Sequence, residues 1–258
     1  MSELAYILLF SIASGLLALV GGAVLLVRQS FVRKFAIHFI SFAVGALLAT
    51  SFLDLLPEAL EHAAEAGRST GNLLIYALGG ILAFFVLEGL ILKFHPHHHE
   101  DEGGDHHHTA PTLLLIGDTI HNFIDGVVVA VAFLTSVPLG IVTALAVAAH
   151  ELPQEISDFS VMLHHGWSQS KVLWANVFSS LFAVLGAVIA YVSRETIEPY
   201  LPQLLAITAG IFIYIATTDL IPELSPYHRR DKTWHIFVLI ALGVGTVWFM
   251  GNLLHGVH

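Results

Sequence analysis

The chain has no cysteine and very little charge. The absence of cysteine among its 258 residues excludes a disulfide framework and a thiolate metal site. Only 12% of the residues are charged, whereas a typical soluble domain has about 25%. Hydrophobic residues make up 56% of the chain, and the mean hydropathy is +0.78. These proportions predict an all-α integral membrane protein with several spans.

Basic residues are also scarce. Ten Lys and Arg stand against 20 Asp and Glu, so the formal net charge is -10. This balance argues against a nucleic-acid partner and suits cations. No Lys or Arg precedes the first apolar run, where a cleavable signal peptide carries basic residues. We therefore expect the first run to be retained as a span in the lipid bilayer.

Eight runs are long enough to cross a membrane, which takes about 20 mostly apolar residues in a helix. We expect spans at 4–28, 34–60, 72–94, 111–134, 138–163, 170–193, 203–222 and 233–255. The run 138–163 is the least apolar, but its polar residues recur at helical spacing. The connections are short except for 95–110, so residues 1–258 are expected to form a single transmembrane domain.

The distribution of Lys and Arg predicts the orientation. With the N-terminus outside, eight of the ten basic residues fall in or beside inside loops, and only Arg68 and Arg194 lie outside. Both termini are therefore expected outside the cytoplasm, with the chain in the plasma (inner) membrane.

A short repeat supports this layout. Residues 54–58 read DLLPE at the end of the second span, and residues 219–223 read DLIPE at the end of the seventh. The first copy would lie at the outer end of its span and the second at the inner end. The pattern predicts that spans 1–3 and 6–8 are inverted repeats around spans 4 and 5, an arrangement typical of transporters. A chance match of five positions is the alternative.

Ionisable residues lie inside spans 4 and 5, where each charge costs on the order of 2.5–3.5 kcal/mol unless it has a partner. Span 4 reads HNFIDG over 121–126, and span 5 reads HELPQEISD over 150–158. His121 and Asp125 are four residues apart and share one helix face. Imidazole beside carboxylate, with no thiol, is a ligand set for a divalent transition metal.

Span 5 offers two pairs at a spacing of four residues, His150 with Gln154 and Glu151 with Glu155. Pro153 removes a backbone hydrogen bond and is expected to kink the helix. Two helices with two ligand faces each predict a binuclear metal centre. One ion would bind His121, Asp125, His150 and Gln154; the other would bind Asn122, Glu151 and Glu155, with Asp125 as a bridge. A helix–helix hydrogen bond is the alternative for any one of these residues.

The pair HNFIDG and HELPQEISD resembles the paired signature of the ZIP family of metal transporters, closest to the branch whose fifth helix reads HExPHExxD. The resemblance implies a 3+2+3 arrangement of eight spans, a binuclear centre at those seven ligands, and metal influx to the cytosol. Zinc is the expected substrate, with iron, manganese or cadmium as alternatives. Neither enzyme activity nor a catalytic cofactor is expected. Gln154 departs from the histidine of that branch, which leaves zinc selectivity open.

Further polar residues predict a path on either side of the centre, because a graded series of weak sites conducts ions. The expected path consists of Asp54, Glu58, Asp118, Asp158, Asn176, Asp219 and Glu223. Interfacial anchoring is the alternative for those at the mouths.

Residues 95–108 read HPHHHEDEGGDHHH and are expected to form a flexible cytoplasmic loop that captures metal. The capturing residues would be His97, His98, His99, His106, His107, His108, His164 and His165. A passive linker is the alternative for this loop.

Two other functions fit part of the pattern. An intramembrane zinc metalloprotease would use His150 and Glu151 as the start of HExxH, but Gln154 stands where the second histidine belongs. A haem carrier would use His121 and His150 as axial ligands. The carboxylates beside both histidines argue against the hydrophobic pocket that haem requires. Small residues such as those at 79–80 would serve a homodimer interface or internal packing equally well.

Overall fold

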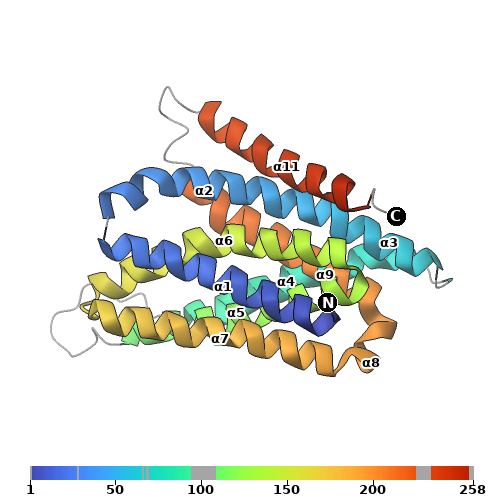
Figure 1. The fold of residues 1–258 in the computed structure, drawn as a ribbon, viewed down its shortest axis with the longest axis horizontal. Coiled ribbons are helices and arrows are strands. Elements are labelled where there is room, and N and C mark those ends of the chain that lie inside the picture. Colours follow the sequence, from blue (N-terminus) through green and yellow to red (C-terminus); the bar gives the residue numbers. More distant parts are fainter. Residues whose placement is uncertain are drawn as a thin grey trace.

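The computed structural model describes residues 2–27, 29–65, 67, 70–93, 109–224 and 234–255, and within these ranges the chain is almost entirely helical, without strands. The helices run side by side along the long axis of the molecule (Figure 1). The first half contains α1 (Glu3–Val27), α2 (Gln29–Ala49), α3 (Leu56–Glu65) and α4 (Leu73–Lys93). The second half contains α5 (Thr109–Thr135), α6 (Val137–His164), α7 (Gln169–Val192), α8 (Arg194–Ile197), α9 (Leu201–Tyr214), α10 (Ile221–Leu224) and α11 (Trp234–His255).

Seven helical stretches in the described part of the chain are long and apolar enough to cross a membrane. Helix α6 is also long, with 28 residues, but its polar residues lower its hydropathy. Large apolar side chains are exposed on the peripheral helices, for example Leu16, Leu78, Phe178 and Phe249. Such a surface suits lipid rather than water. The all-α membrane fold predicted from the sequence is therefore confirmed, whereas the 3+2+3 grouping stays a prediction.

Helices α5 and α6 form an antiparallel hairpin that positions the polar motifs. Ser136 alone separates them, and its Oγ accepts a hydrogen bond from the backbone N–H of Leu139 at 3.3 Å, which caps α6. His121 and Glu151 are both fifteen residues from Ser136, so the hairpin brings them to the same height. Helix α5 packs against α7 and α6 packs against α1, which surrounds the hairpin with other helices.

Two π-helical segments occur where the DLxPE repeat begins. They are η1 (Thr50–Leu55), between α2 and α3, and η5 (Ile215–Leu220), between α9 and α10. Each ends on the Asp-Leu pair of the repeat, and the Pro of the repeat is the second residue of the helix that follows. The helical stretches run continuously over 29–65 and 201–224, so they extend beyond the predicted spans 34–60 and 203–222. Single π-helical turns are rare and occur frequently at functional sites.

Close helix crossings depend on glycine. At Gly80 of α4, an added Cβ would lie 2.3 Å from the backbone oxygen of Ile207 in α9, so only glycine fits without a shift. At the neighbouring Gly79 no atom lies within 4 Å of such a Cβ. Gly80 therefore serves internal packing, which is one of the two roles considered for this pair, and the homodimer stays a prediction.

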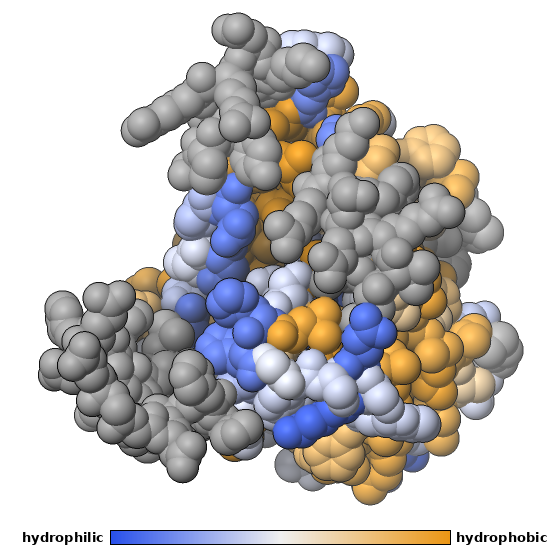
Figure 2. Space-filling model, turned by 90° about the vertical axis from the view of Figure 1, so that its left-hand side faces the viewer, coloured by the Kyte–Doolittle hydropathy of each residue, from blue (hydrophilic) through white to orange (hydrophobic). Residues whose placement is uncertain are grey.

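Hydrophilic residues gather at the end of the molecule where residues 165–168 connect α6 to α7 (Figure 2). In this view, apolar residues dominate the right-hand flank. His164 is exposed at this end and His165 is half-buried, with their ring centroids 5.7 Å apart. The other predicted capture residues, at 97–99 and 106–108, lie outside the described residues. Helix α5 begins at Thr109, two residues before the predicted start of the fourth span at residue 111.

Candidate metal centre

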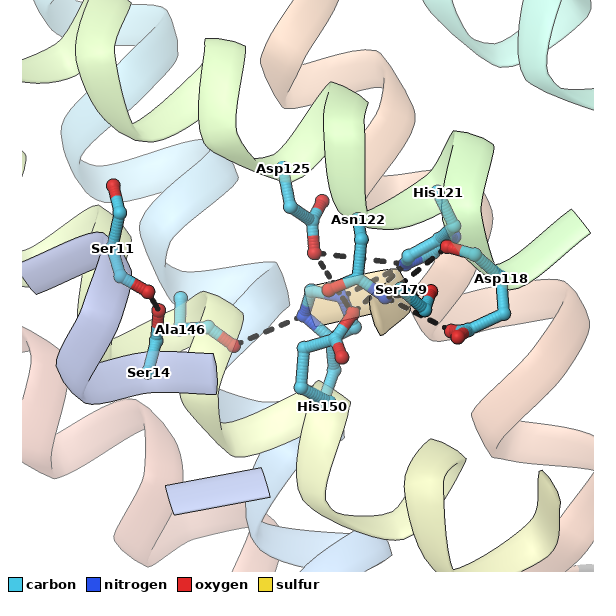
Figure 3. A network of polar contacts seen from close by, with 10 residues as sticks. Ser11, Ser14, Asp118, His121, Asn122, Asp125, Ala146, His150 and Ser179 are labelled. Carbon is cyan, nitrogen blue, oxygen red and sulfur yellow. Dashed lines mark hydrogen bonds and ion pairs between the residues drawn. The ribbon is translucent and has the colours of Figure 1, made fainter. Parts of the chain in front are cut away.

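Four side chains from the α5–α6 hairpin converge in the interior. We call His121, Asp125, His150 and Glu151 the histidine cluster; one ligand atom from each lies within 4.8 Å of the others. Their side chains are between 0 and 11% exposed. Figure 3 shows three of them, on α5 and α6, turned toward one another. No Lys or Arg within the described ranges forms an ion pair with them.

Five of the six separations between the four ligand atoms are 3.0–3.8 Å, and the sixth, between Asp125 and Glu151, is within 4.8 Å. His121 Nε2 is 3.2 Å from His150 Nε2, 3.6 Å from Asp125 Oδ2 and 3.5 Å from Glu151 Oε1. His150 Nε2 is 3.0 Å from the same Asp125 oxygen and 3.8 Å from the same Glu151 oxygen. A tetrahedral zinc ion with ligand bonds of about 2.0–2.1 Å requires ligand separations of about 3.3–3.4 Å. The cluster therefore has the dimensions of a four-coordinate metal site.

The two imidazoles are held in place by neighbours. His150 Nδ1 lies 3.2 Å from the backbone oxygen of Ala146, one turn earlier in α6. If Nδ1 carries the proton and donates it to that oxygen, the Nε2 lone pair faces the cluster, as metal ligation requires. The ring of Phe84 packs edge-on against His121 at 5.5 Å, and Phe212 packs against His150 at 6.1 Å. These contacts fix both rings before any ion arrives.

The carboxylates of the cluster have spare coordinating capacity. Asp125 Oδ2 and Glu151 Oε1 are buried, and outside the histidine cluster neither has a hydrogen-bond partner among the described residues. Buried ionised oxygens are costly unless a cation or a donor joins them. A cavity of about 10 Å³ lies beside them, roughly the space of one water molecule. It is lined by Ser11, Ser14, Gly15, Asn122, Asp125, Gly126, Val129, Val147, Glu151 and Ala183.

The structure groups the predicted ligands differently from the two i,i+4 pairs. Glu151 lies with both histidines, although the sequence assigned it to the second ion with Glu155. Asn122 turns toward α7: its Nδ2 donates to Asp118 Oδ1 at 3.0 Å and to Ser179 Oγ at 3.3 Å (Figure 3). Gln154 is half-buried and Glu155 is buried. Four of the seven predicted ligands thus form one cluster, and the places of the other three as ligands stay predictions.

The predicted path residues have different exposures. Asp118, Asp158 and Asn176 are buried at 4, 6 and 0% exposure. Asp54, at 9%, is also buried, whereas Asp219 is half-buried and Glu223 is exposed. In α3, Glu58 Oε1 in the first turn lies 3.4 Å from His62 Nε2. Of the buried members, Asp118 and Asp158 lie on the α5–α6 hairpin itself, Asn176 on α7 and Asp54 in η1.

One polar contact was not expected from the sequence. The Tyr214 hydroxyl on α9 donates a hydrogen bond to Glu88 Oε2 on α4. Phe84, one turn before Glu88, packs against Tyr214 at 5.7 Å and also against His121. The Phe84 ring therefore connects the Tyr214–Glu88 pair to the histidine cluster. The available signal was a single acidic residue in an otherwise apolar third span.

Comparisons with known proteins point to one family of transporters. A model of the ZIP zinc transporter family matches residues 2–113 and 94–251. Zinc transporter ZIP13 of Pongo abelii is 33% identical over 216 residues, which covers 80% of this chain and 63% of that protein. Zinc transporter ZIP4 of Homo sapiens is 37% identical over 147 residues, covering 56% of this chain and 22% of that protein. The chain thus spans less than two thirds of these relatives.

Proposed function

The chain belongs to the ZIP zinc transporter family, and on that premise we propose that it carries divalent transition-metal ions across the membrane into the cytosol. Zinc is the first candidate, because the relatives are named zinc transporters; iron, manganese and cadmium suit the same ligands. The observation that carries the proposal is the close spacing of the four ligand atoms of the histidine cluster at the centre of the hairpin. Two imidazoles and two carboxylates can replace the water that an ion loses on entering the membrane.

Several finer features belong to the same proposal. The binuclear centre would add Asn122, Gln154 and Glu155 as ligands. Spans 1–3 and 6–8 would form inverted repeats, with both termini outside the cytoplasm and the chain in the plasma membrane. The matching positions of the two π-helical segments support the repeat. Ions would enter past Asp54 and Glu58 and leave past Asp219 and Glu223, toward the capturing histidines of the loop and of residues 164–165.

The geometry does not favour the metalloprotease. A hydrolytic zinc has three protein ligands and keeps a fourth position for water, whereas here four side chains each bring a ligand atom to one site. The haem alternative also fits poorly. Two axial nitrogens on one iron would be separated by about 4 Å, twice a metal–nitrogen bond of about 2.0 Å, and the observed separation is 3.2 Å. The cavity beside the site, of about 10 Å³, is far too small for a macrocycle.

Uptake into proteoliposomes tests the proposal. We expect saturable influx of zinc, and the ranking of zinc, manganese, iron and cadmium would define selectivity. His121→Ala should lower uptake by more than about 100-fold, because even residues that only support a metal ligand cost about 10–100-fold. His235→Ala is the matched control, since His235 is exposed on α11. Equal uptake by the two variants, or no influx of any ion through folded wild-type protein, would overturn the proposal.

A further inference from the structure

Helix α4 contacts the histidine cluster through one aromatic side chain. The ring of Phe84, which is 7% exposed, lies edge-on to that of His121, with the ring centroids 5.5 Å apart. The two histidines differ in how their rings are held. His150 is fixed at Nδ1 by the backbone oxygen of Ala146. Within the described part of the chain, His121 has hydrogen-bond and ion-pair partners only at Nε2, inside the cluster. Packing against Phe84 therefore orients the His121 ring.

Tyr214 packs against the same part of α4. Its ring, at the end of α9, lies 5.7 Å from that of Phe84 and 6.4 Å from that of Phe85. Its hydroxyl donates a hydrogen bond to Glu88 Oε2, one turn beyond Phe84. Tyr214 is only 6% exposed, so its side chain is enclosed on nearly all sides. Glu88 thus anchors the Tyr214 hydroxyl, and the Tyr214 ring in turn supports that of Phe84.

Close packing of two helices does not by itself require these side chains. Helix α11 approaches α2 at Gly243 as closely as α4 approaches α9 at Gly80. At the matching distances from these glycines and from the Asp of the repeat, the residues are apolar: Val247, Gly251 and Ala49 stand in place of Phe84, Glu88 and Tyr214. An acidic side chain inside a span is costly and marks a functional residue by default. Packing alone therefore does not account for Glu88.

We propose that Glu88 is a positioning residue of the metal centre, which acts on His121 through Tyr214 and Phe84. The carboxylate does not touch the ion. It fixes the Tyr214 hydroxyl, and the two aromatic rings hold the imidazole in the orientation that ligation requires. Metal ligands must be held within about 0.5 Å of their productive positions, and partners outside the ligand shell supply that restraint. This role rests on the proposed metal centre, since it concerns how one of its ligands is held.

Binding of Co²⁺ to the purified full-length chain tests this role. Co²⁺ is the probe because its visible absorption reports the geometry of its ligands, and a titration gives its affinity. Tyr214→Phe keeps the ring and removes only the hydroxyl. We expect about tenfold weaker Co²⁺ binding and an altered spectrum, because loss of an outer partner typically costs about 10–100-fold in metal affinity. Tyr76→Phe, which removes the hydroxyl of a 41% exposed tyrosine on α4, is the matched control.

Two substitutions of Glu88 separate its hydrogen bond from its charge. Glu88→Gln keeps a side-chain oxygen that can accept from Tyr214, so we expect Co²⁺ binding close to that of the wild-type protein. Glu88→Ala removes the acceptor and should match Tyr214→Phe in both affinity and spectrum. If Glu88→Gln binds Co²⁺ as weakly as Glu88→Ala, the carboxylate acts through its charge and the positioning role is overturned.

The connection through Phe84 is tested by a double-mutant cycle. Phe84→Leu should weaken Co²⁺ binding by about tenfold, whereas Phe85→Leu is the matched control, because Phe85 is 59% exposed. Adding Tyr214→Phe to Phe84→Leu should have little further effect, since residues that act through one contact are not additive. Additive losses would show that Tyr214 does not act through Phe84 and would overturn the proposal.

A purely structural role gives a different pattern. Tyr214→Phe and Glu88→Ala would then lower the melting temperature, while the folded protein kept its Co²⁺ affinity and spectrum, and the positioning role would be overturned. Folded wild-type protein that binds no Co²⁺ would overturn the metal centre together with this role. Wild-type protein and variants that bind Co²⁺ in the expected pattern, without any flux, would overturn the transport function and leave the positioning role standing.

Discussion

Helix α4 crosses α9, and helix α11 crosses α2, through the same arrangement of glycines. In the first crossing, an added Cβ would lie 2.3 Å from the Ile207 oxygen at Gly80 and 2.0 Å from the Ala77 oxygen at Gly210. In the second crossing, the values are 2.2 Å from the Phe42 oxygen at Gly243 and 2.1 Å from the Ile240 oxygen at Gly45. Each helix thus places a glycine against the backbone of its partner.

The two crossings also correspond along the sequence. Gly45 stands nine residues before Asp54, and Gly210 stands nine residues before Asp219. A π-helical segment precedes the Pro of the repeat in both cases. The two crossings therefore share their glycine spacing and a π-helical segment, as the predicted repeat requires.

The chemistry of the two crossings differs. Eight residues after Gly80 lies Glu88, which accepts a hydrogen bond from Tyr214. Eight residues after Gly243 lies Gly251, where an added Cβ would be 3.0 Å from Asp54 Oδ1. The first crossing is polar and its acidic residue, Asp219, is half-buried, whereas the second is tightly packed around a buried Asp54. A shared glycine spacing with one buried and one half-buried aspartate is consistent with a single state of an alternating-access cycle.

The strongest test of the shared framework is alanine at the contacting glycines. We expect Gly80→Ala and Gly243→Ala each to destabilise the protein by about 3 kcal/mol or more, because overpacking typically costs about 1–3 kcal/mol and here the clash is with backbone. Thermal unfolding of the purified protein in detergent measures the loss. Gly79→Ala and Gly245→Ala are the matched controls, since no atom lies within 4 Å of an added Cβ at either position. If only one crossing tolerates alanine, the two are not equivalent.

Most of the fold could be predicted from apolar run length. Eight spans were expected, and each coincides with a long helical stretch within the described residues. Helix α6 required its polar spacing as well, since it is not among the seven stretches apolar enough to cross a membrane. The π-helical segments could not be predicted, because they depend on backbone hydrogen bonds that no side-chain pattern records.

The sequence predicted which residues belong to the site more accurately than which of them lie together. Helical spacing correctly placed His121 with Asp125, which are 3.6 Å apart at their nearest ligand atoms. It separated His150 from Glu151, because adjacent residues point about 100° apart on a helix of 3.6 residues per turn. The flexible Glu151 side chain reaches back to within 3.8 Å of His150 Nε2. The Glu88 contact could not be predicted, because its partner, Tyr214, is 126 residues away in the chain.

A smaller effect should come from the Tyr214–Glu88 hydrogen bond of the α4–α9 crossing. Tyr214→Phe removes the donor and leaves the Glu88 carboxylate unpaired, which should cost about 1–3 kcal/mol. Thermal unfolding and zinc uptake measure the consequence for stability and transport. Tyr76→Phe on α4, the helix that carries Glu88, is the control, because Tyr76 is 41% exposed. A Tyr214→Phe variant as stable as the control would mean that the hydrogen bond is not what distinguishes the crossings.

The smallest expected effect, a difference in labelling rate, tests whether one end is closed. The chain has no native cysteine, so Asp54→Cys and Asp219→Cys each introduce one thiol at equivalent positions of the repeat. Because thiol reactivity requires solvent access, a small methanethiosulfonate reagent should label Asp219→Cys at least about tenfold faster in proteoliposomes. Position 54 is only 9% exposed, and residue 219 is half-buried. Equal rates would show that the protein exchanges between its two open states faster than the reagent reacts. The difference in exposure between Asp54 and Asp219 would then belong to one conformation and not to the resting protein.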